Sequence, residues 1–309
     1  MDELDFSPNP KGAPQGAQRA AENAAQQAAP SQGAMYQPRV ALEFFRSAGS
    51  GESVTGGKPV FSEGDKYGGF FGKPAKMYLL IEGEVGLMVK NRFFGVVKAG
   101  QLFGELAVVA KLPRTATAMA KTDCKLLTLD EKQFHAALQK KPEFALMLMG
   151  IMLHRFRDSM AALARAGVAP EAGTRGGVFD AKQLAQLDEL LPDVHPIAYP
   201  AGKQVVNAGG LSLFMYVIKQ GEVSILVQNK VVERVGTGGV FGEAALVEGG
   251  ARTASVVTDE GCEVYGIKRD QFIKLVASHP AFGAALLKST AERMQAAARQ
   301  VAEAPQPAP

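Results

Sequence analysis

The chain has 309 residues, of which 47% are apolar and 21% charged, and its formal net charge is +3. This length allows two domains, each with its own core, and the composition is that of a soluble globular protein. The small net charge gives no broad basic field of the kind that binds nucleic acid, although a localised basic patch is compatible with it. We therefore expect no direct nucleic-acid binding.

No segment of the sequence predicts secretion or membrane insertion. The N-terminus, MDELDFSPNP, is acidic and lacks the apolar stretch of a secretory signal. The longest apolar run, ALMLMGIML, is far shorter than the ~20 residues that a membrane helix needs. The expectation is a cytoplasmic protein that does not contact a membrane.

Three segments have the composition of linkers or tails. Residues 1–38 are rich in Ala, Gln, Pro and Gly and cannot bury enough apolar surface to offset their ordering entropy, which predicts a disordered tail. Within it, QRAAENAAQQAA at 18–29 has the helix propensity of a transient helix or docking segment. We also predict a linker at 166–179, where glycine is frequent, and a second disordered tail at 303–309.

The chain between these segments contains two similar stretches of sequence, which indicates a duplicated domain. Residues 77–144 align with 215–282 at a constant offset of 138, without a gap. Upstream, PVFSEG matches QVVNAG at an offset of 145, so the first copy has seven extra residues around KYGGFFGKPAK. We therefore predict two domains of one fold, at 39–165 and 180–302.

Each copy has a β pattern first and an α pattern afterwards. Runs such as MYLLIEGEVGLMVK and MYVIKQGEVSILVQ are rich in β-formers and interrupted by Gly, as in a compact all-β unit. Asp130 and Asp270 are predicted N-caps of the helices that follow the last strands. AKQLAQLDELL predicts a helix before the second copy, whereas VALEFFRSAGSGESV, before the first, is expected to be extended. The predicted fold is mainly β with flanking helices.

The helix that ends the first copy has an apolar stripe. From Leu153, the residues Phe156, Met160 and Leu163 follow at steps of three and four. This stripe is wider and more apolar than a lone exposed helix would keep. We predict that it packs on the second domain or on a partner chain, the latter giving a homodimer through the helix around 145–165, and that bound ligand shifts it. The alternative is that the stripe covers the core of its own domain.

One phrase of the repeat places polar residues in an apolar setting. FGELAVVAKLPRTATA at 103–118 recurs as FGEAALVEGGARTASV at 241–256, each with Gly-Glu and, nine positions after Glu, Arg-Thr. Gly lets the backbone turn tightly, and the small residues after Glu can open a short helix whose N–H groups attract an anion. Arg is a forked cation for phosphate, and Glu accepts hydrogen bonds from sugar hydroxyls. The pattern predicts a sugar-phosphate site; the alternative is an internal Glu–Arg salt bridge.

This pattern, FGE-x-A followed after six residues by RTA, resembles the phosphate-binding cassette of the cyclic nucleotide-binding domain. That family includes regulatory subunits of cAMP-dependent kinase, cGMP-dependent kinases, cyclic-nucleotide-gated channels and catabolite-activator-like transcription factors. The Gly-Glu-Val triplets at 83–85 and 221–223, and Gly100 and Gly238 before the two cassettes, fit the same family. The resemblance implies two tandem cyclic nucleotide-binding β-rolls, jelly-roll-like, each followed by a C-terminal helix.

The resemblance also implies a role for each matching residue. Glu105 and Glu243 would accept from the ribose 2′-hydroxyl, and Arg114 and Arg252 would pair with the cyclic phosphate. The other implied ligand-binding residues are Gly104, Leu106, Ala107, Gly242, Ala244 and Ala245, through their backbone groups, and Thr115 and Thr253, beside the phosphate and the base. Thr after Arg is compatible with both cGMP and cAMP, so the ligand stays open between them. The chain has no Trp, so an aromatic lid over the base would be Tyr or Phe.

The remaining candidate residues favour structural roles. Cys124 and Cys262 occupy equivalent strand positions and are predicted to be buried free thiols. The four histidines lack metal-ligand spacing, and no nucleophile–base constellation is present, so we expect no metal site, no cofactor and no enzyme activity. KYGGFFGK lacks the Lys-Ser/Thr of a phosphate loop and is expected to be a surface hairpin.

These features lead to the hypothesis of a cytoplasmic cAMP or cGMP receptor with two sites. The sequence contains no kinase motif, no pore helices and no helix-turn-helix after a nucleotide domain, so we expect signalling through an unknown effector protein or a dimer. One alternative is a structural or interaction protein whose cassettes no longer bind. The other is a regulatory subunit of a kinase, although 1–38 has no Arg-Arg-x-Ser/Ala-like inhibitor segment.

Overall fold

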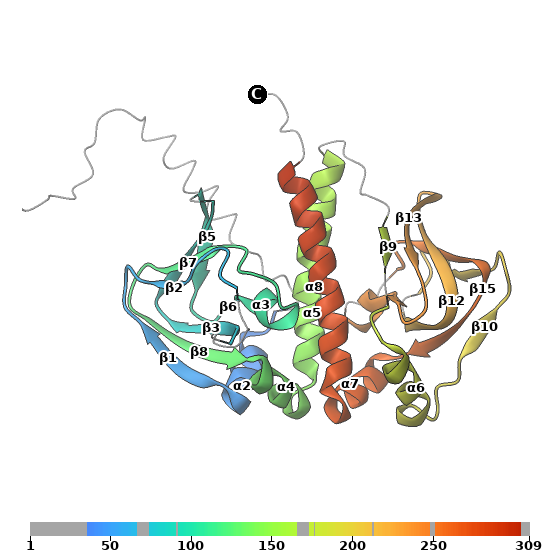
Figure 1. The fold of residues 1–309 in the computed structure, drawn as a ribbon, viewed down its shortest axis with the longest axis horizontal. Helices are drawn as coiled ribbons and strands as arrows, with labels where there is room; N and C mark the ends of the chain where they lie inside the picture. The colour runs from blue at the N-terminus through green and yellow to red at the C-terminus, as the bar shows by residue number, and fades with distance from the viewer. Residues whose placement is uncertain are drawn as a thin grey trace, which may run out of the picture.

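The structure is a computed structural model that describes most of the chain. The described residues are 36–66, 74–90, 92–165, 173–175, 177–211, 213–247 and 251–303. Within them, two units rich in β-strand lie on opposite sides of a pair of long helices (Figure 1). We call these units the first copy (36–165) and the second copy (173–303). The predicted fold, mainly β with flanking helices, is confirmed.

The first copy forms two sheets between its flanking helices. Its elements are α2 (Pro38–Ala48), β1 (Ser50–Val54), β2 (Pro59–Phe61), β3 (Lys76–Glu82), β4 (Glu84–Val89), β5 (Arg92–Lys98), β6 (Leu102–Phe103), α3 (Glu105–Val109), β7 (Thr117–Ala120), β8 (Cys124–Asp130), α4 (Glu131–Lys140) and α5 (Glu143–Arg165). Among its described residues, the strands form two four-stranded sheets, in the orders β1-β8-β3-β6 and β2-β7-β4-β5. The described pairs within both sheets are antiparallel.

The second copy repeats this architecture with longer strands. Its elements are β9 (Gly173–Arg175), α6 (Ala181–Leu190), β10 (Ile197–Tyr199), β11 (Gln204–Val206), β12 (Met215–Val227), β13 (Lys230–Val235), β14 (Val240–Phe241), the 3₁₀ helix η1 (Glu243–Leu246), β15 (Ser255–Ile267), α7 (Arg269–Ser278) and α8 (Pro280–Glu303). Here β12 spans the positions of β3 and β4, and β15 those of β7 and β8. The described strands therefore join into one seven-stranded sheet.

The helix that opens the first copy differs from the expectation. The segment expected to be extended forms α2 instead, because Ala41, Phe44 and Phe45 fall at steps of three and one and are all fully buried on one face. Pro38 lies in the first turn, where its missing N–H costs no hydrogen bond. The ring of Phe44 stacks on Phe144 of α5, with 3.6 Å between centroids. The expectation of an extended opening was wrong.

The predicted linker also contains ordered structure. β9 lies within the expected linker 166–179 and pairs in parallel with β13 at the edge of the sheet. The N–H groups of Val178 and Phe179 donate to the carbonyl of Gly238, and Phe179 is buried. The rest of that segment, 166–172 and 176, lies outside the described residues.

The two predicted tails lie mostly outside the described residues, at 1–35 and 304–309. They stay predictions there, as do the helix at 18–29 and the hairpin in KYGGFFGK. At 36–38 the structure differs from the expected tail, because the hydroxyl of Tyr36 donates to the carbonyl of Gly100 and Pro38 opens α2. Glu303, expected in the second tail, is the last residue of α8.

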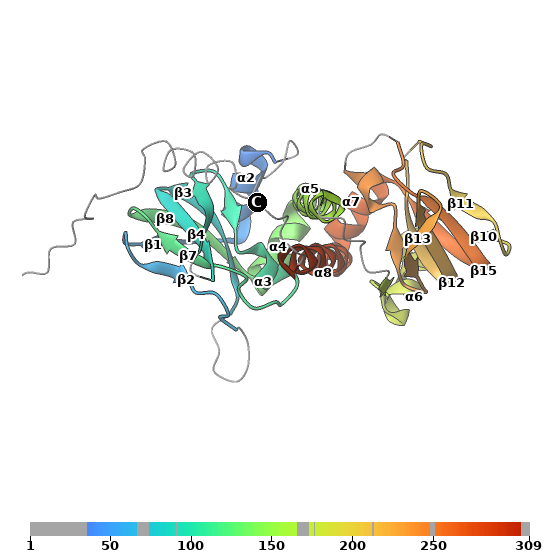
Figure 2. The ribbon, with the colours of Figure 1, turned by 90° about the horizontal axis from the view of Figure 1, so that it is seen from above.

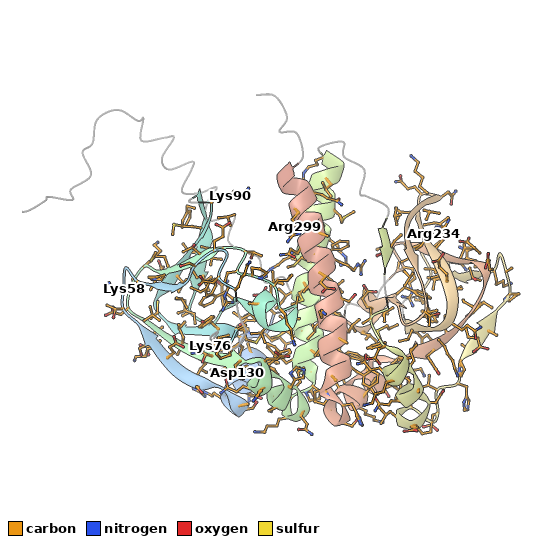
Figure 3. All side chains as sticks on the ribbon, in the orientation of Figure 1. Lys58, Lys76, Lys90, Asp130, Arg234 and Arg299 are labelled. Carbon is orange, nitrogen blue, oxygen red and sulfur yellow. The ribbon has the colours of Figure 1, made fainter. Side chains whose placement is uncertain are left out.

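The two predicted N-caps have different outcomes. Asp130 caps α4, since its carboxylate accepts from the N–H of Gln133 at 2.8 Å (Figure 3). In the second copy α7 begins at Arg269, so Asp270 lies inside the first turn, where a negative charge favours the helix dipole. The prediction of Asp270 as an N-cap was therefore wrong.

The stripe of α5 packs inside the chain. α5 and α8 lie side by side and run in the same direction (Figures 1 and 2). Leu153 of α5 and Met294 of α8 belong to one buried apolar cluster, which includes residues of both copies, and Leu163 is fully buried. The prediction that this helix packs on the second domain is confirmed. In this structure α8, rather than a partner chain, occupies the face that we considered for a homodimer through 145–165.

Both cysteines are buried free thiols, as predicted. Cys124 is 2% exposed and Cys262 is 6% exposed. Burial raises the pKa of each thiol, because the thiolate loses its hydration.

The packing of α2 generates a stability prediction. Phe44→Ala should lower the free energy of unfolding by about 3–5 kcal/mol, because it removes a fully buried ring and leaves a cavity. Urea denaturation followed by circular dichroism measures the change. The control is Arg39→Ala on the same helix, whose side chain is 91% exposed and should change stability by less than about 0.5 kcal/mol. Equal effects of the two substitutions would contradict the described position of α2.

Candidate ligand-binding site

Each copy of the repeated phrase folds into a short strand, a left-handed glycine and a short helix. We call these segments the first cassette (103–118) and the second cassette (241–256), of which 248–250 lie outside the described residues. Gly104 and Gly242 both have φ of 72° and are the N-caps of α3 and η1. The short helix that we expected after Glu is therefore present in both copies.

The glycine is required by conformation and by space. A residue with a side chain rarely adopts a φ of 72°. A Cβ added to Gly104 would lie 2.6 Å from Nη1 of Arg114, and one added to Gly242 would meet Nη1 of Arg252. The glycine thus allows the arginine, which follows ten positions later, to approach the backbone closely.

Two backbone carbonyls orient each arginine. Arg114 donates from Nη1 to the carbonyl of Gly104 at 2.7 Å and from Nη2 to that of Lys76 at 2.6 Å. Lys76 lies at the start of β3, paired in register with Asp130 (Figure 3). Arg252 makes the equivalent bonds, at 3.2 Å and 2.5 Å, to the carbonyls of the residues at the same places in the second copy. Both guanidinium groups therefore have the same fixed orientation within their copies.

Aromatic rings lie against both arginines, more closely in the first copy. Cζ of Arg114 lies 3.8 Å from the ring centroid of Phe61 and 5.5 Å from that of Tyr78. Cζ of Arg252 lies 5.6 Å from the ring centroid of Tyr216, the counterpart of Tyr78. A cation over a ring face is stabilised by the quadrupole of the ring. The rings thus add to the positioning of each cation.

The second arginine is less covered than the first. Arg114 is 4% exposed, whereas Arg252 is half-buried, and Val206 stands in the second copy at the place of Phe61. Burial lowers the pKa of Arg252, while the nearby Tyr216 and Glu243 act in the opposite direction. An arginine starts from so high a pKa that it stays charged near neutral pH. Both sites therefore offer a permanent cation.

Each cassette glutamate is buried and pairs with an arginine that sequence analysis missed. Glu105 is 4% exposed, and its Oε1 accepts from Nη1 of Arg155 on α5 at 2.5 Å. Glu243 is 7% exposed and pairs in the same way with Arg293 on α8. Both arginines follow their glutamates by 50 residues. This equal spacing is a signal in the sequence, although both arginines lie after the end of the ungapped repeat at 77–144 and 215–282.

The other predicted residues surround these groups. Ala107 is buried, and Leu106, Ala244 and Ala245 are half-buried on the short helices. Thr115 and Thr253 are exposed, directly after the arginines. The structure therefore brings Gly, Glu and Arg together at the buried part of each cassette and places Thr at its surface.

Each cassette also lies against the long helix of the other copy. α3 contacts α8, and η1 contacts α5. The glutamate of each cassette meanwhile pairs with the long helix of its own copy. The α5–α8 helix pair therefore contacts both cassettes.

The second copy has two surface hollows, neither of which includes the central residues of its cassette. One, of about 730 Å³, includes the ion-paired residues Glu222, Arg234 and Asp259, of which Arg234 is labelled in Figure 3. The other, of about 280 Å³, includes Phe214 and Lys268. Neither is lined by Gly242, Glu243 or Arg252, so we place the candidate site by the convergence of charged groups and not by the size of a hollow.

The described ranges offer neither a metal-binding cluster nor a membrane-spanning helix. These ranges contain no group of three or more His, Cys, Asp and Glu side chains that could hold a metal ion. None of their helices has the length and apolarity that crossing a lipid bilayer requires.

Two stretches of the chain match one known family. The family described as "cyclic nucleotide-binding domain" matches residues 52–141 and 196–279, which together are more than half of the chain. This chain belongs to that family. It contains two tandem cyclic nucleotide-binding domains and is similar to the regulatory regions of cAMP- and cGMP-dependent protein kinases.

Two curated relatives match about two thirds of this chain or slightly more. A cAMP-dependent protein kinase regulatory subunit of Eremothecium gossypii is 27% identical over 226 residues, which cover 72% of this chain and 43% of the relative. The cGMP-dependent protein kinase egl-4 of Caenorhabditis elegans is 24% identical over 213 residues, covering 66% of this chain and 25% of the relative. This chain thus spans less than half the length of these relatives.

A solved structure of the regulatory domain of Toxoplasma gondii PKA with cAMP also matches this chain. It is 20% identical, covers 87% of this chain and 98% of its own, and has a TM-score of 0.29.

The close approach of Arg114 to Gly104 generates a prediction. Gly104→Ala should destabilise the protein more than Gly57→Ala, by at least about 1 kcal/mol, because both alanines have a left-handed φ but only the first displaces a bonded arginine. Gly57 is the matched control, since its added Cβ meets nothing within 4 Å. Urea denaturation of both variants measures the difference. If their stabilities are equal, Arg114 is not held where we describe it.

Proposed function

We propose that this protein is a receptor for a cyclic nucleotide, cAMP or cGMP, with one site in each of two domains, 39–165 and 180–302. The observation that carries the proposal is the same in both copies. A buried glutamate and an arginine oriented by two backbone carbonyls converge at a left-handed glycine. Membership of the cyclic nucleotide-binding domain family supports the same ligand class.

In the proposed complex the arginine binds the cyclic phosphate. A guanidinium has five N–H donors, and the bonds to the two carbonyls orient this group toward the cassette. A charge-assisted hydrogen bond from an oriented arginine is stronger than one from a neutral donor. Backbone N–H groups of the short helix after the glycine add donors for the same anion.

The glutamate binds the ribose in this proposal. A carboxylate has two oxygens with about four lone-pair sites, so Glu105 can accept from a 2′-hydroxyl while Oε1 bonds to Arg155. The ion pair between Glu105 and Arg155 also reduces repulsion between the glutamate and the phosphate. A bare carboxylate would repel a phosphate nearby, whereas the Glu105–Arg155 pair has no net charge and leaves Arg114 to attract the anion.

We propose that the receptor is not an enzyme and acts through an effector protein, with α5 shifting when ligand binds. A ligand shifts such an equilibrium only as far as its affinities for the two arrangements differ. The similarity to a kinase regulatory subunit supports a regulatory role. The proposed location is the cytoplasm, where the two buried free thiols fit a reducing compartment.

A second candidate function is that of a regulatory subunit of a kinase. The observation that favours it is the similarity to the Eremothecium gossypii subunit over 72% of this chain. A pull-down with residues 1–38 against protein kinases tests it. The third possibility, an interaction protein without ligand, is decided by the binding measurement below.

Calorimetric titration with cAMP and, in parallel, with cGMP tests the proposed function. Because both copies have the same Gly, Glu and Arg, we expect up to two nucleotides bound per chain. Saturable binding of neither nucleotide would overturn the receptor proposal. A stoichiometry of one nucleotide per chain would mean that one copy has lost the ability to bind it.

The two arginines should dominate affinity. Arg114→Ala and Arg252→Ala should each weaken one site by about 30-fold to several thousand-fold, since loss of a desolvated charge partner costs about 2–5 kcal/mol. The matched control is Arg234→Ala, which removes an arginine of the second copy that pairs with Glu222 and Asp259 outside the cassette. It should leave both affinities unchanged. Wild-type binding by both cassette variants would show that the phosphate is bound elsewhere.

A further inference from the structure

Two consecutive residues of α5 are linked to the glutamates of the two cassettes, one directly and one through an arginine of α8. Arg155 pairs directly with Glu105 of its own copy. Phe156, the next residue, lies under Arg293 of α8, whose Cζ is 4.9 Å from the ring centroid. Arg293 in turn pairs with Glu243 of the second cassette. The contact between Phe156 and Arg293 therefore crosses from the first copy to the ligand site of the second.

We propose that Phe156 is a positioning residue for the second ligand site, through its contact with Arg293. This inference rests on the proposed function. It assigns to a residue of the first domain a part in the affinity of the second, and it identifies a path by which the two sites are coupled.

The surroundings of Arg293 explain why it depends on an aromatic ring. Its side chain is 22% exposed, and besides the bond to Glu243 its Nη2 lies 3.7 Å from Oε2 of Glu233 on β13. A guanidinium between two carboxylates can turn toward either one. The flat ring of Phe156 supports the planar cation on a third side, because a guanidinium stacks on aromatic faces. Phe156 thus supports the orientation in which Arg293 contacts both Glu243 and Glu233.

The arrangement is not symmetric between the two copies. The counterpart of Phe156 in the second copy, 138 residues later, is Met294, which has a flexible thioether in place of a ring. Met294 is buried in the cluster between the copies. We therefore expect the second site to depend on Phe156, whereas the first site has no aromatic residue at the equivalent position of α8.

A contiguous series of contacts follows from these pairs. It runs from Glu105 to Arg155, along one peptide bond to Phe156, and from there to Arg293 and Glu243. A ligand that shifts α5 through Glu105 would therefore alter the support of Arg293. By thermodynamic linkage, the second ligand would alter the affinity of the first site by the same factor.

The test measures each site separately. The first measurement uses a chain with Arg114→Ala, in which the first site is weakened. There, Phe156→Leu should weaken binding of cAMP or cGMP to the second site by about 3- to 10-fold, as expected for loss of a partly desolvated cation–π contact. In a chain with Arg252→Ala, the same substitution should change the first site by less than about twofold. Met160→Leu, on the same stripe of α5, is the matched control and should change neither affinity.

A double-mutant cycle separates this role from simple packing. With Arg293→Gln the side chain is neutral and gives the ring no cation, although its amide can still donate to Glu243, so Phe156→Leu should then have almost no further effect on the second site. An unchanged second site in the Phe156→Leu chain, or an equal loss with and without Arg293→Gln, would overturn the inference while leaving the receptor proposal intact. A chain with Arg114→Ala that binds neither nucleotide would instead overturn the proposed function of the second site, and this inference with it.

Discussion

A carboxylate buried in a protein needs a partner, and this requirement connects the candidate ligand site to the rest of the structure. The glutamates of the two cassettes are only 4% and 7% exposed. In each copy the partner is an arginine of the long helix that follows the last strand. An unpaired charge at such a position would cost several kcal/mol, so the long helix is fixed against the cassette of its own copy.

The same two helices also join the copies. α5 packs on α8, and the apolar cluster between them contains residues of both copies. Because α3 lies against α8 and η1 lies against α5, a change in one cassette acts on a surface that the other cassette shares. The helix that neutralises the buried glutamate of each cassette thus also packs against the other copy.

The two sites are similar in plan but differ in detail. The helix after the glycine is an α-helix in the first copy and a 3₁₀ helix in the second. Phe61 lies close against Arg114, whereas the second copy has Val206 at that place and a less covered arginine. The cost of exposing each cation to a ligand therefore differs. We expect unequal affinities even though Gly, Glu and Arg are repeated without change.

The parts of the site that sequence predicted are those set by local chemistry. The left-handed turn at Gly104, the short helix after it and the return of Arg114 all lie within the first cassette, and the repeat gave each of them twice. Arg155 was missed because its role depends on how α5 packs, 50 residues beyond Glu105. Its own neighbourhood in the sequence is that of an ordinary amphipathic helix.

The flanking helices also depend on contacts that local sequence does not reveal. The segment VALEFFRSAGSGESV, most of which forms α2 and β1, was predicted to be extended throughout. The helical form of α2 follows from burial of Phe44 against Phe144, a contact that only the folded chain creates. Asp270 has the chemistry of an N-cap, but the helix begins one residue before it, because the N–H of Lys268 is already bonded by the side chain of Gln271.

Joining the two copies in one chain has a consequence for regulation. A contact between the long helices of two separate chains would weaken on dilution, whereas here α5 and α8 are held at a high effective concentration by the connecting segment. Coupling between the sites can therefore be small in free energy and still operate at any protein concentration. A shift of 1.4 kcal/mol in the α5–α8 contact is enough to change the affinity of a site about tenfold. Contacts as modest as that between Phe156 and Arg293 are within the range needed for such regulation.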